Sequence, residues 1–236
     1  MKLTYIYHSG YAIEAKDFTI IIDYYKDSDN KVVRNNLLKK KGRLYVLSTH
    51  SHHDHFNKEI LSWKTEHPDI IYIFSRDILT NENAKDRDAI YLDKSGFYRD
   101  ETLFIQAYGS TDLGISFLIK AEDKIIFHAG DLNNWHWNEE STAEEIQEAE
   151  DFYQKELDLL VADVKHLDLA MFPIDPRLGK DYMKGAKQFV DAIQTDILAP
   201  MHFDKAYDKA GAFAGIALEK GCKCVCWKQT GESILF

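Results

Sequence analysis

The hydrophobic and polar positions in the first half of the chain follow a strand-like pattern. Apolar residues alternate with polar ones, or form short runs, over residues 3–25, with Gly10 and Lys16–Asp17 as turn points. Residues 89–131 show the same pattern and indicate successive antiparallel strands, with a tight hairpin at 121–123. The first half is therefore expected to be mainly β-structure.

Between these two regions the pattern predicts a short alternation of helix and strand. A helix around 31–41 is expected to end at Gly42, which can take the left-handed cap conformation. The run RLYVLST (43–49) is typical of a buried strand, and DIIYIF (69–74) indicates another. A helix is expected over about 57–66, between the two strands.

The second half alternates helix and strand more regularly. A long helix is expected from Ser141, where Ser141 and Glu144 have the spacing of a capping box. The elements expected after it are strand 167–174, helix 181–194, strand 196–203, helix 204–221, and strands 223–227 and 233–236. No linker or repeat interrupts the chain, so one domain over 1–236 is expected. Its class is α/β (α+β), a four-layer αββα sandwich of two mixed sheets with helices on the outer faces.

Composition narrows the classes of function. The chain of 236 residues is 45% hydrophobic and 29% charged, the balance of a soluble globular protein. Its net charge of −10 argues against a nucleic-acid partner. No apolar run approaches the roughly 20 residues that span a bilayer, and the N-terminus lacks the pattern of a signal peptide. We expect a cytoplasmic protein with a small-molecule substrate and no nucleic-acid or membrane partner; a homo-oligomer is compatible with these features.

The strongest chemical signal is the loop STHSHHDHFN (48–57), which follows an expected strand. Imidazole and carboxylate groups are the ligands that metals such as zinc prefer. In an irregular loop the alternate residues His50 and His52 can converge on one ion, and Asp54 and His55 then point towards a second. The loop therefore predicts a metal site.

This His-x-His-x-Asp-His spacing resembles the signature of the metallo-β-lactamase superfamily. The resemblance implies an aspartate that bridges two metals, matched by Gly130-Asp131, and a late histidine after a strand, matched by His202. Residues 8–23 look like the superfamily's opening hairpins. Residues 167–190 look like the branch that includes ascorbate 6-phosphate lactonases and N-acylphosphatidylethanolamine phospholipase D.

One element of the superfamily pattern is absent. Ser110 occupies the place where the superfamily has a histidine before the Gly-Asp. The resemblance then implies a weak first metal position, held by His50, His52 and Asp131. The second position is complete; its ligands are Asp54, His55, Asp131 and His202. The candidates to supply the missing ligand are His8, Ser110, Asp112 and His128. Two zinc ions are expected, with manganese or iron favoured by oxygen-rich coordination.

The segment NNWHWNEE (133–140) directly follows the bridging aspartate and is expected to line the mouth of the site. Trp135 and Trp137 either stack on a substrate or cover the core, and the sequence leaves both interpretations open. His136 is a candidate proton donor. Phe203 and Tyr24 are further candidates for substrate contact, and Arg177 and Lys180 are basic residues able to approach the site.

The resemblance implies a metal-dependent hydrolase of a small ester, lactone, amide or phosphodiester. Its nucleophile would be a metal-bound hydroxide, since two metals lower the pKa of water towards about 7. Asp54, Asp131 and His136 are the candidate catalytic residues. Two alternatives remain open: a degenerate site that binds metal or senses a ligand without turnover, and a di-iron oxidoreductase.

Overall fold

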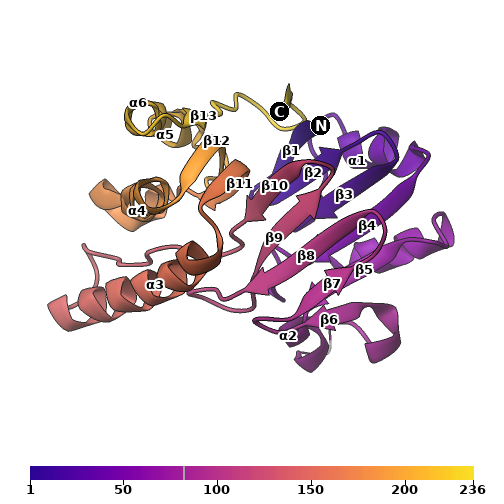
Figure 1. Ribbon diagram of the computed structural model, residues 1–236, viewed down its shortest axis with the longest axis horizontal. Helices are drawn as coiled ribbons and strands as arrows, with labels where there is room; N and C mark the ends of the chain where they lie inside the picture. Colours follow the sequence, from indigo (N-terminus) through magenta and orange to yellow (C-terminus); the bar gives the residue numbers. More distant parts are fainter. Residues whose placement is uncertain (82) are drawn as a thin grey trace.

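The computed structural model describes residues 1–81 and 83–236, and within them two sheets of seven strands pack face to face (Figure 1). The first sheet runs in the order β14 (Ser233–Leu235), β1 (Lys2–Tyr7), β2 (Gly10–Glu14), β3 (Phe18–Ile22), β4 (Arg43–Ser48), β5 (Ile71–Ser75) and β6 (Ile90–Leu92). The second sheet runs in the order β13 (Lys223–Cys224), β12 (Gln194–Met201), β11 (His166–Pro173), β10 (Lys124–His128), β9 (Ser116–Ala121), β8 (Leu103–Tyr108) and β7 (Phe97–Arg99).

Both sheets are mixed. In the first, the pairs from β14 to β3 are antiparallel and those from β3 to β6 are parallel. In the second, the pairs from β13 to β10 are parallel and those from β10 to β7 are antiparallel. Strands β1 and β14 pair edge to edge, so the two chain termini lie side by side (Figure 1).

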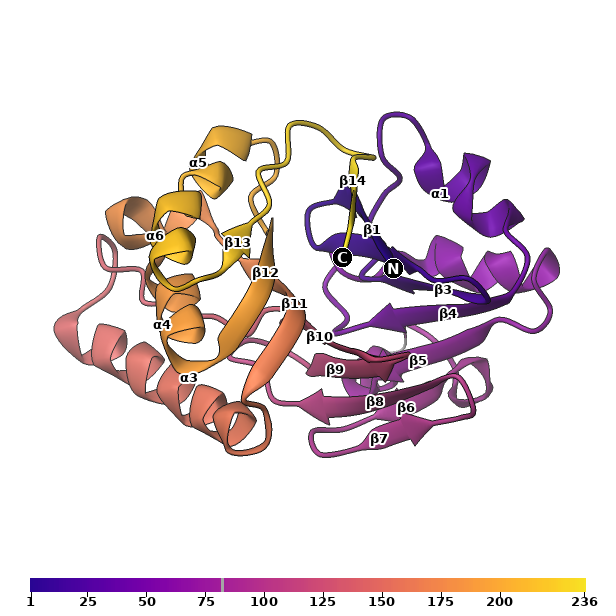
Figure 2. The ribbon, with the colours of Figure 1, turned by 45° about the horizontal axis from the view of Figure 1, so that its top comes forward.

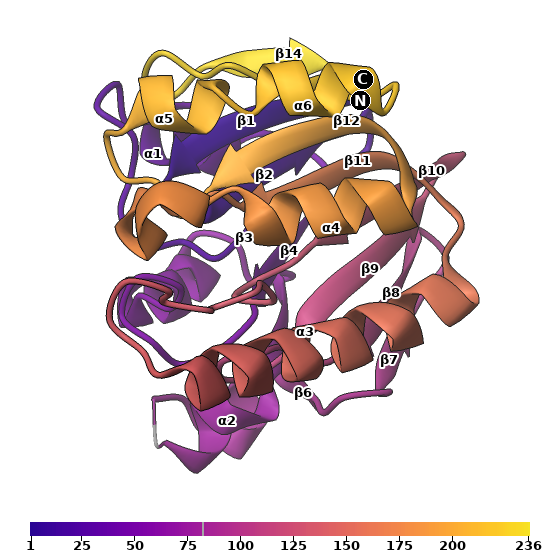
Figure 3. The same ribbon diagram turned by 90° about the vertical axis from the view of Figure 1, so that its left-hand side faces the viewer.

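Helices cover the outer faces of the two sheets (Figure 2). The α-helices are α1 (Val32–Asn35), α2 (Arg76–Thr80), α3 (Ala143–Asp163), α4 (Lys184–Ala192), α5 (Tyr207–Gly211) and α6 (Ala214–Glu219). The 3₁₀-helices are η1 (Leu37–Lys39), η2 (Lys58–Thr65), η3 (Asp86–Asp88) and η4 (Pro176–Asp181). Figure 3 shows α3, α4 and α6 in front of the second sheet. The predicted four-layer αββα class is confirmed.

Strand β3 shows why the central strands are apolar without interruption. Ile20 and Ile22 face the core between the two sheets, whereas Ile21 faces the layer beneath α1 and η2. Successive side chains point to opposite faces, and both faces are buried here. In the outer layer Trp63 of η2 is almost fully buried. The apolar run of β3 therefore contributes side chains to two hydrophobic layers, one on each face of the first sheet.

Several predicted elements differ in detail. Strand β6 pairs with β5 in the first sheet, whereas β7 belongs to the second, so 89–131 is not one antiparallel series. The capping box of α3 uses Thr142 and Glu145, one residue later than predicted, and here the Thr142 hydroxyl accepts from the Glu145 amide at 3.3 Å. The expected helix 204–221 is divided into α5 and α6.

The helix expected at 31–41 is likewise divided into α1 and η1, because Asn36 leaves helical geometry with φ −124°. Gly42 has φ +108° as its predicted left-handed role requires. In the described part of the chain, α3 is the longest helix, and none of the helices is both long and apolar enough to cross a membrane.

Candidate metal centre

Loops from both sheets meet at one end of the sandwich and surround an open cleft of about 480 Å³. The histidine loop follows β4, Asp112 follows β8, Asp131 follows β10 and His202 follows β12. The cleft is lined by His52, His53, Asp54, Thr111, Asp112, Asp131, Trp135, Trp137, Arg177 and His202. Packing the sheets face to face thus brings together residues that lie far apart in the sequence.

Two clusters of possible metal ligands lie at the floor of this cleft. The first consists of His50, His52, Asp112 and Asp131, with one ligand atom of each within 4.8 Å of all the others. The second consists of His8, Asp54, His55 and His202, on the same criterion. His8 comes from the turn between β1 and β2, and its carbonyl accepts a hydrogen bond from the His202 amide at 3.2 Å.

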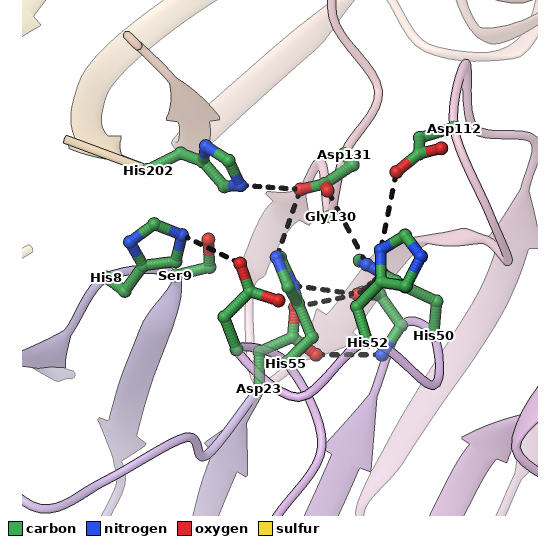
Figure 4. Close-up of polar contacts among 12 residues, drawn as sticks. His8, Ser9, Asp23, His50, His52, His55, Asp112, Gly130, Asp131 and His202 are labelled. Carbon is green, nitrogen blue, oxygen red and sulfur yellow. Dashed lines mark hydrogen bonds and ion pairs between the residues drawn. The ribbon is translucent and has the colours of Figure 1, made fainter. Parts of the chain in front are cut away.

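Asp131 lies between the two clusters (Figure 4). One carboxylate oxygen, Oδ1, is 3.1 Å from Nε2 of His55 and 3.5 Å from Nε2 of His202. The other, Oδ2, is 3.5 Å from Nε2 of His50 in the first cluster. Its two oxygens thus face different clusters, as the bridging role requires.

The backbone before Asp131 needs glycine. Gly130 has φ +54°, and a Cβ there would lie 2.9 Å from Cβ of Thr49. Glycine alone adopts this conformation without a steric cost and leaves room for the histidine loop. Gly130 therefore lets β10 approach the end of β4 closely enough to place Asp131 between the clusters.

Three histidines have a carboxylate behind them. Nδ1 of His55 is 2.8 Å from Asp23, and Nδ1 of His202 is 2.9 Å from Asp175. Nδ1 of His8 is 3.0 Å from Asp204. A carboxylate accepts a hydrogen bond from Nδ1–H, which keeps the proton on Nδ1 and leaves the lone pair of Nε2 directed at the centre. This is the arrangement in which metal-binding histidines are commonly held.

Whether these residues fit a metal can be judged from the buried polar atoms that have no hydrogen-bond partner. Over residues 1–81 and 83–236, Nε2 of His8, His50 and His55 and Oδ1 of Asp131 are buried and have no hydrogen-bond partner. Leaving such atoms unpaired is costly, and native structures rarely tolerate it. Nitrogen lone pairs and carboxylate oxygens that converge in this way fit divalent cations.

The electrostatics of the cluster agree with that fit. Burial opposes a charge on His55, but the carboxylates of Asp131 and Asp23 raise its pKa well above the usual range. Burial and the neighbouring His55 lower the pKa of His50 to about 3, so the His50 ring is neutral. Burial would raise the pKa of Asp131, yet His55 and His202 hold it well below its usual range. The site is built for positive charge at its centre.

Comparison with known proteins identifies the family. The model of the beta-lactamase superfamily domain matches residues 2–148. The chain belongs to the metallo-β-lactamase superfamily. No curated protein matches the sequence significantly.

Solved structures share the superfamily fold. The chain is similar to Igni18, a novel metallo hydrolase from Ignicoccus hospitalis, with TM-score 0.70 and 18% identity over 99% of this chain and 97% of that one. It is similar to YhfI, a metallo-β-lactamase fold protein from Bacillus subtilis, with TM-score 0.66 and 12% identity over 99% and 98% of the two chains. For CmlA, a diiron beta-hydroxylase from Streptomyces venezuelae, the TM-score is 0.67 with 13% identity over 100% of this chain and 54% of that one.

Asp112, two residues after the position where the superfamily has its histidine, reaches the site. The Ser110 hydroxyl accepts a hydrogen bond from the Asp112 amide at 3.3 Å. Oδ2 of Asp112 lies 3.4 Å from Nδ1 of His52 in the first cluster. His8, one of the candidates for that position, lies in the second cluster instead.

The rings of His128 and His136 are held by hydrogen bonds with backbone groups. Nε2 of His128 donates to the Ser9 carbonyl at 2.9 Å, and its Nδ1 accepts from the Gly130 amide at 3.1 Å. His136 is buried, with Nε2 3.2 Å from the carbonyl of Asp181. Both rings are used by backbone groups, so the structure corrects the expectation that either faces a metal or a substrate.

The aromatic candidates divide into two groups. Trp135 and Trp137 line the cleft as stacked rings, 6.4 Å apart and inclined by 16°, and Nε1 of Trp135 donates to the Asp131 carbonyl at 2.8 Å. Tyr24 instead packs edge-on against Trp63 in the outer layer, and Phe203 stacks on Tyr5 in the core; each is 2% exposed. The expectation that these last two lie at the mouth is wrong, because their rings fill hydrophobic layers.

Arg177 reaches the cleft, but Lys180 is not among the cleft residues. The Arg177 guanidinium contacts both Asp175 and Nδ1 of His202, the latter at 3.1 Å. The sequence pattern did not point to the carboxylates that hold the histidines, which are Asp23, Asp175 and Asp204. Two of them, Asp23 and Asp175, nevertheless carried a usable signal, since they follow the apolar runs of β3 and β11 just as Asp131 follows that of β10.

Proposed function

We propose that this protein is a metal-dependent hydrolase of a small ester, lactone, amide or phosphodiester. The observation that carries the proposal is the convergence of buried, unpartnered ligand atoms from His8, His50, His55 and Asp131 beside an open cleft. Membership of the superfamily and the likeness in fold to a metallo hydrolase support the same reaction class.

Two metal ions are the proposed cofactor, with zinc the expected metal and manganese or iron the alternatives. His50, His52 and Asp131 would hold the first ion, and Asp54, His55, His202 and Asp131 the second. When bound, such a pair lowers the pKa of water towards about 7, supplies a hydroxide nucleophile and polarises the scissile carbonyl or phosphoryl group.

Asp54 is proposed to orient the nucleophile. It lines the cleft, and its side chain is partly buried. Burial would raise its pKa, but the contact with His8 at 3.4 Å and the charge of His55 lower the pKa of Asp54 below the usual range. An aspartate that stays ionised accepts hydrogen bonds and is a weak base, so it fixes the direction of attack more than it takes up a proton.

The walls of the cleft favour an organic substrate with an apolar part. The stacked Trp135 and Trp137 offer a flat apolar surface beside Asp131, and such rings bind by contact area as well as by stacking. Arg177 adds a positive charge on the same cleft. These features are compatible with phosphorylated lactones or phosphodiesters, the substrates of the branch that residues 167–190 resemble.

Metal analysis combined with a turnover screen tests the proposal. Purified protein is assayed for bound metal and for hydrolysis of p-nitrophenyl acetate, a γ-lactone and bis(p-nitrophenyl) phosphate. We expect two metal equivalents and turnover of at least one probe, both lost in His55→Ala. His166→Ala, which removes a partly exposed histidine paired with Asp196, is the matched control and keeps both. Metal-free protein without turnover, after supply of zinc, manganese and iron, would refute the proposal.

One observation favours a second candidate, a di-iron oxidoreductase. The first cluster carries Asp112, an oxygen ligand, in place of a nitrogen ligand, and oxygen-rich sets favour iron or manganese over zinc. The chain also shares its fold with a diiron beta-hydroxylase. Two iron equivalents after purification from iron-replete cells would favour this function. One tight ion without turnover would favour the degenerate site.

A further inference from the structure

We propose that the two metal positions of this protein are chemically unequal, because Asp112 supplies an oxygen ligand to the first and His8 supplies an additional imidazole to the second. This inference rests on the metal binding proposed above and assigns ligands that the superfamily pattern leaves open. In effect, the nitrogen ligand absent at Ser110 is replaced by oxygen, and the second position gains a histidine from the turn between β1 and β2 of the first sheet.

The loop after β8 holds Asp112 towards the first cluster. The Thr111 hydroxyl donates to the Asn133 carbonyl at 2.6 Å and to the Asp131 carbonyl at 3.2 Å, which ties this loop to the segment that carries the bridging aspartate. The Ser110 hydroxyl accepts from the Asp112 amide and is used within the loop. Asp112 is thereby placed 3.4 Å from Nδ1 of His52, with its side chain half-exposed towards the cleft.

His8 is arranged in the same way as the two histidines expected at the second position. Its Nδ1 has a carboxylate partner, Asp204, as His55 has Asp23 and His202 has Asp175. Its Nε2 is buried without a hydrogen-bond partner, within the described part of the chain, and lies 3.4 Å from Oδ2 of Asp54. The His8 and His202 rings are 4.2 Å apart between centroids.

The backbone of His8 supports this assignment. His8 has φ +56°, a left-handed conformation that is uncommon for residues other than glycine and persists where the surroundings impose it. Its amide donates to the Tyr5 hydroxyl at 3.0 Å, and its carbonyl accepts from the His202 amide at 3.2 Å. These two bonds fix the ring beside His202. A histidine needed only for a surface ion pair with Asp204 would not require this placement.

The two positions therefore differ in donor chemistry. The first has two imidazoles and the carboxylates of Asp112 and Asp131, whereas the second has three imidazoles and the carboxylates of Asp54 and Asp131. Nitrogen-rich sets suit zinc, and oxygen-rich sets suit manganese and iron. We infer that zinc fills the second position first and that the first position has the greater preference for manganese.

Calorimetric titration of the metal-free protein with Zn²⁺, and then with Mn²⁺, tests this inference without depending on activity. Wild type is expected to show one tight zinc step and one weaker step that accepts Mn²⁺, the latter also followed by the loss of the free Mn²⁺ electron paramagnetic resonance signal. Asp112→Asn should abolish the Mn²⁺ step alone. His8→Asn should weaken the tight zinc step at least about tenfold. Loss of a group that only holds a metal ligand in place already costs about ten- to a hundredfold in metal affinity.

Further variants guard against misfolding and against indirect effects. Asparagine is chosen at position 8 because it tolerates a left-handed backbone. Asp204→Asn, at a largely exposed carboxylate, leaves the backbone of His8 intact and should weaken the zinc step by about ten- to a hundredfold. The double variant Ser110→His with Asp112→Ala should convert the Mn²⁺-accepting step into a second zinc step. His166→Gln is the control and should leave both steps unchanged.

The outcomes separate this inference from the proposed function. Two zinc steps of equal affinity in wild type, unaffected by both Asp112→Asn and His8→Asn, would overturn the unequal centre and leave the metal-dependent function standing. Absence of any Zn²⁺ or Mn²⁺ binding in wild type would overturn both. Selective loss of one step in each single variant, with circular dichroism unchanged, is the expected result.

Discussion

Oδ2 of Asp23 lies 2.8 Å from Nδ1 of His55, and this fully buried pair joins the first sheet to the histidine loop. Asp23 directly follows β3. Its carboxylate also accepts hydrogen bonds from the Thr49 amide at 2.8 Å and from the Thr49 hydroxyl at 2.7 Å. Burial would raise the pKa of Asp23, but His55 and His128 lower it. One ionised carboxylate therefore fixes both the path of the loop and the orientation of the His55 ring.

Replacing Asp23 with asparagine is expected to lower zinc affinity. An amide can direct its NH₂ group at Nδ1 of His55, which would favour the tautomer with a proton on Nε2, facing Asp131. We expect a loss of about ten- to a hundredfold in zinc affinity, measured by calorimetry. Asp196→Asn, which disturbs only the partly exposed pair with His166, should retain the affinity. Equal affinities in the two variants would contradict the role of Asp23.

Removing metal is expected to destabilise the protein. A ligand at a hundred times its Kd stabilises the folded state by about 2.7 kcal/mol, which in a chain of this size corresponds to a Tm shift of about 5–10 °C. Wild type treated with a chelator should melt lower by this amount, as measured by differential scanning calorimetry. His55→Ala should respond much less to the chelator. A chelator-independent Tm in wild type would contradict a tightly bound metal.

Gly114 is expected to be intolerant of a side chain. It has φ +76°, and a Cβ would overlap the Thr49 carbonyl oxygen and lie 2.6 Å from Cβ of His50. Gly114→Ala should push the histidine loop away from β9, cost about 1–3 kcal/mol of unfolding free energy and weaken metal binding at the first position. The measurements are urea denaturation and metal titration.

Gly215 offers the matched control for that substitution. It lies in α6, and a Cβ there meets nothing within 4 Å. Gly215→Ala should therefore stabilise the protein slightly, by roughly 0.5–1 kcal/mol, because alanine is the better helix former. If both variants had the same stability and metal content, the close approach of Gly114 to His50 would be unimportant.

Asp100 is expected to contribute stability that is lost in acid. Burial would raise its pKa, but hydrogen bonds from the Tyr45 hydroxyl and from the amides of Leu103 and Thr102 lower it to about 2. The folded-state pKa is thus below the unfolded value of about 3.9, so the contribution is present above about pH 4 and lost as pH falls towards 2. Asp100 also binds Arg43 at 3.1 Å and so links β4 to the β7–β8 hairpin of the other sheet.

Urea denaturation at several pH values measures this contribution. Asp100→Asn should be less stable than wild type near neutral pH, and the difference should shrink as pH falls from about 4 to 2. Asp123→Asn, in the exposed turn between β9 and β10, should follow the wild-type pH dependence. A difference between wild type and Asp100→Asn that stays constant over this range would contradict the lowered pKa.

Local sequence pattern was enough to predict most of the β-structure. Continuous apolar runs such as that of β3 are buried on both faces, so their strand character does not depend on which neighbour they find. Weak local signals failed where tertiary packing decides. The short β6 joins the first sheet although β7, only a few residues later, joins the second.

The candidate site was likewise only partly predictable from the sequence. The His-x-His-x-Asp-His loop, Gly130-Asp131 and His202 could be predicted, because each directly follows a strand and strand ends meet at one edge of the sandwich. The positions of His8 and Asp112 could not, since either was a candidate for the same missing ligand. His136 and Tyr24 were misplaced because a side chain's direction in a loop depends on neighbours distant in sequence.

The sequence by itself determined the strands, the histidine loop and the residue types available for coordination, because these follow from local periodicity and chemistry. Only the tertiary structure decided how the candidate ligands are divided between two clusters. His8 and Asp204 lie 196 residues apart, and their 3.0 Å contact arises where the turn between β1 and β2 meets the loop after β12. Such contacts depend on the register and packing of two whole sheets, which no local pattern specifies.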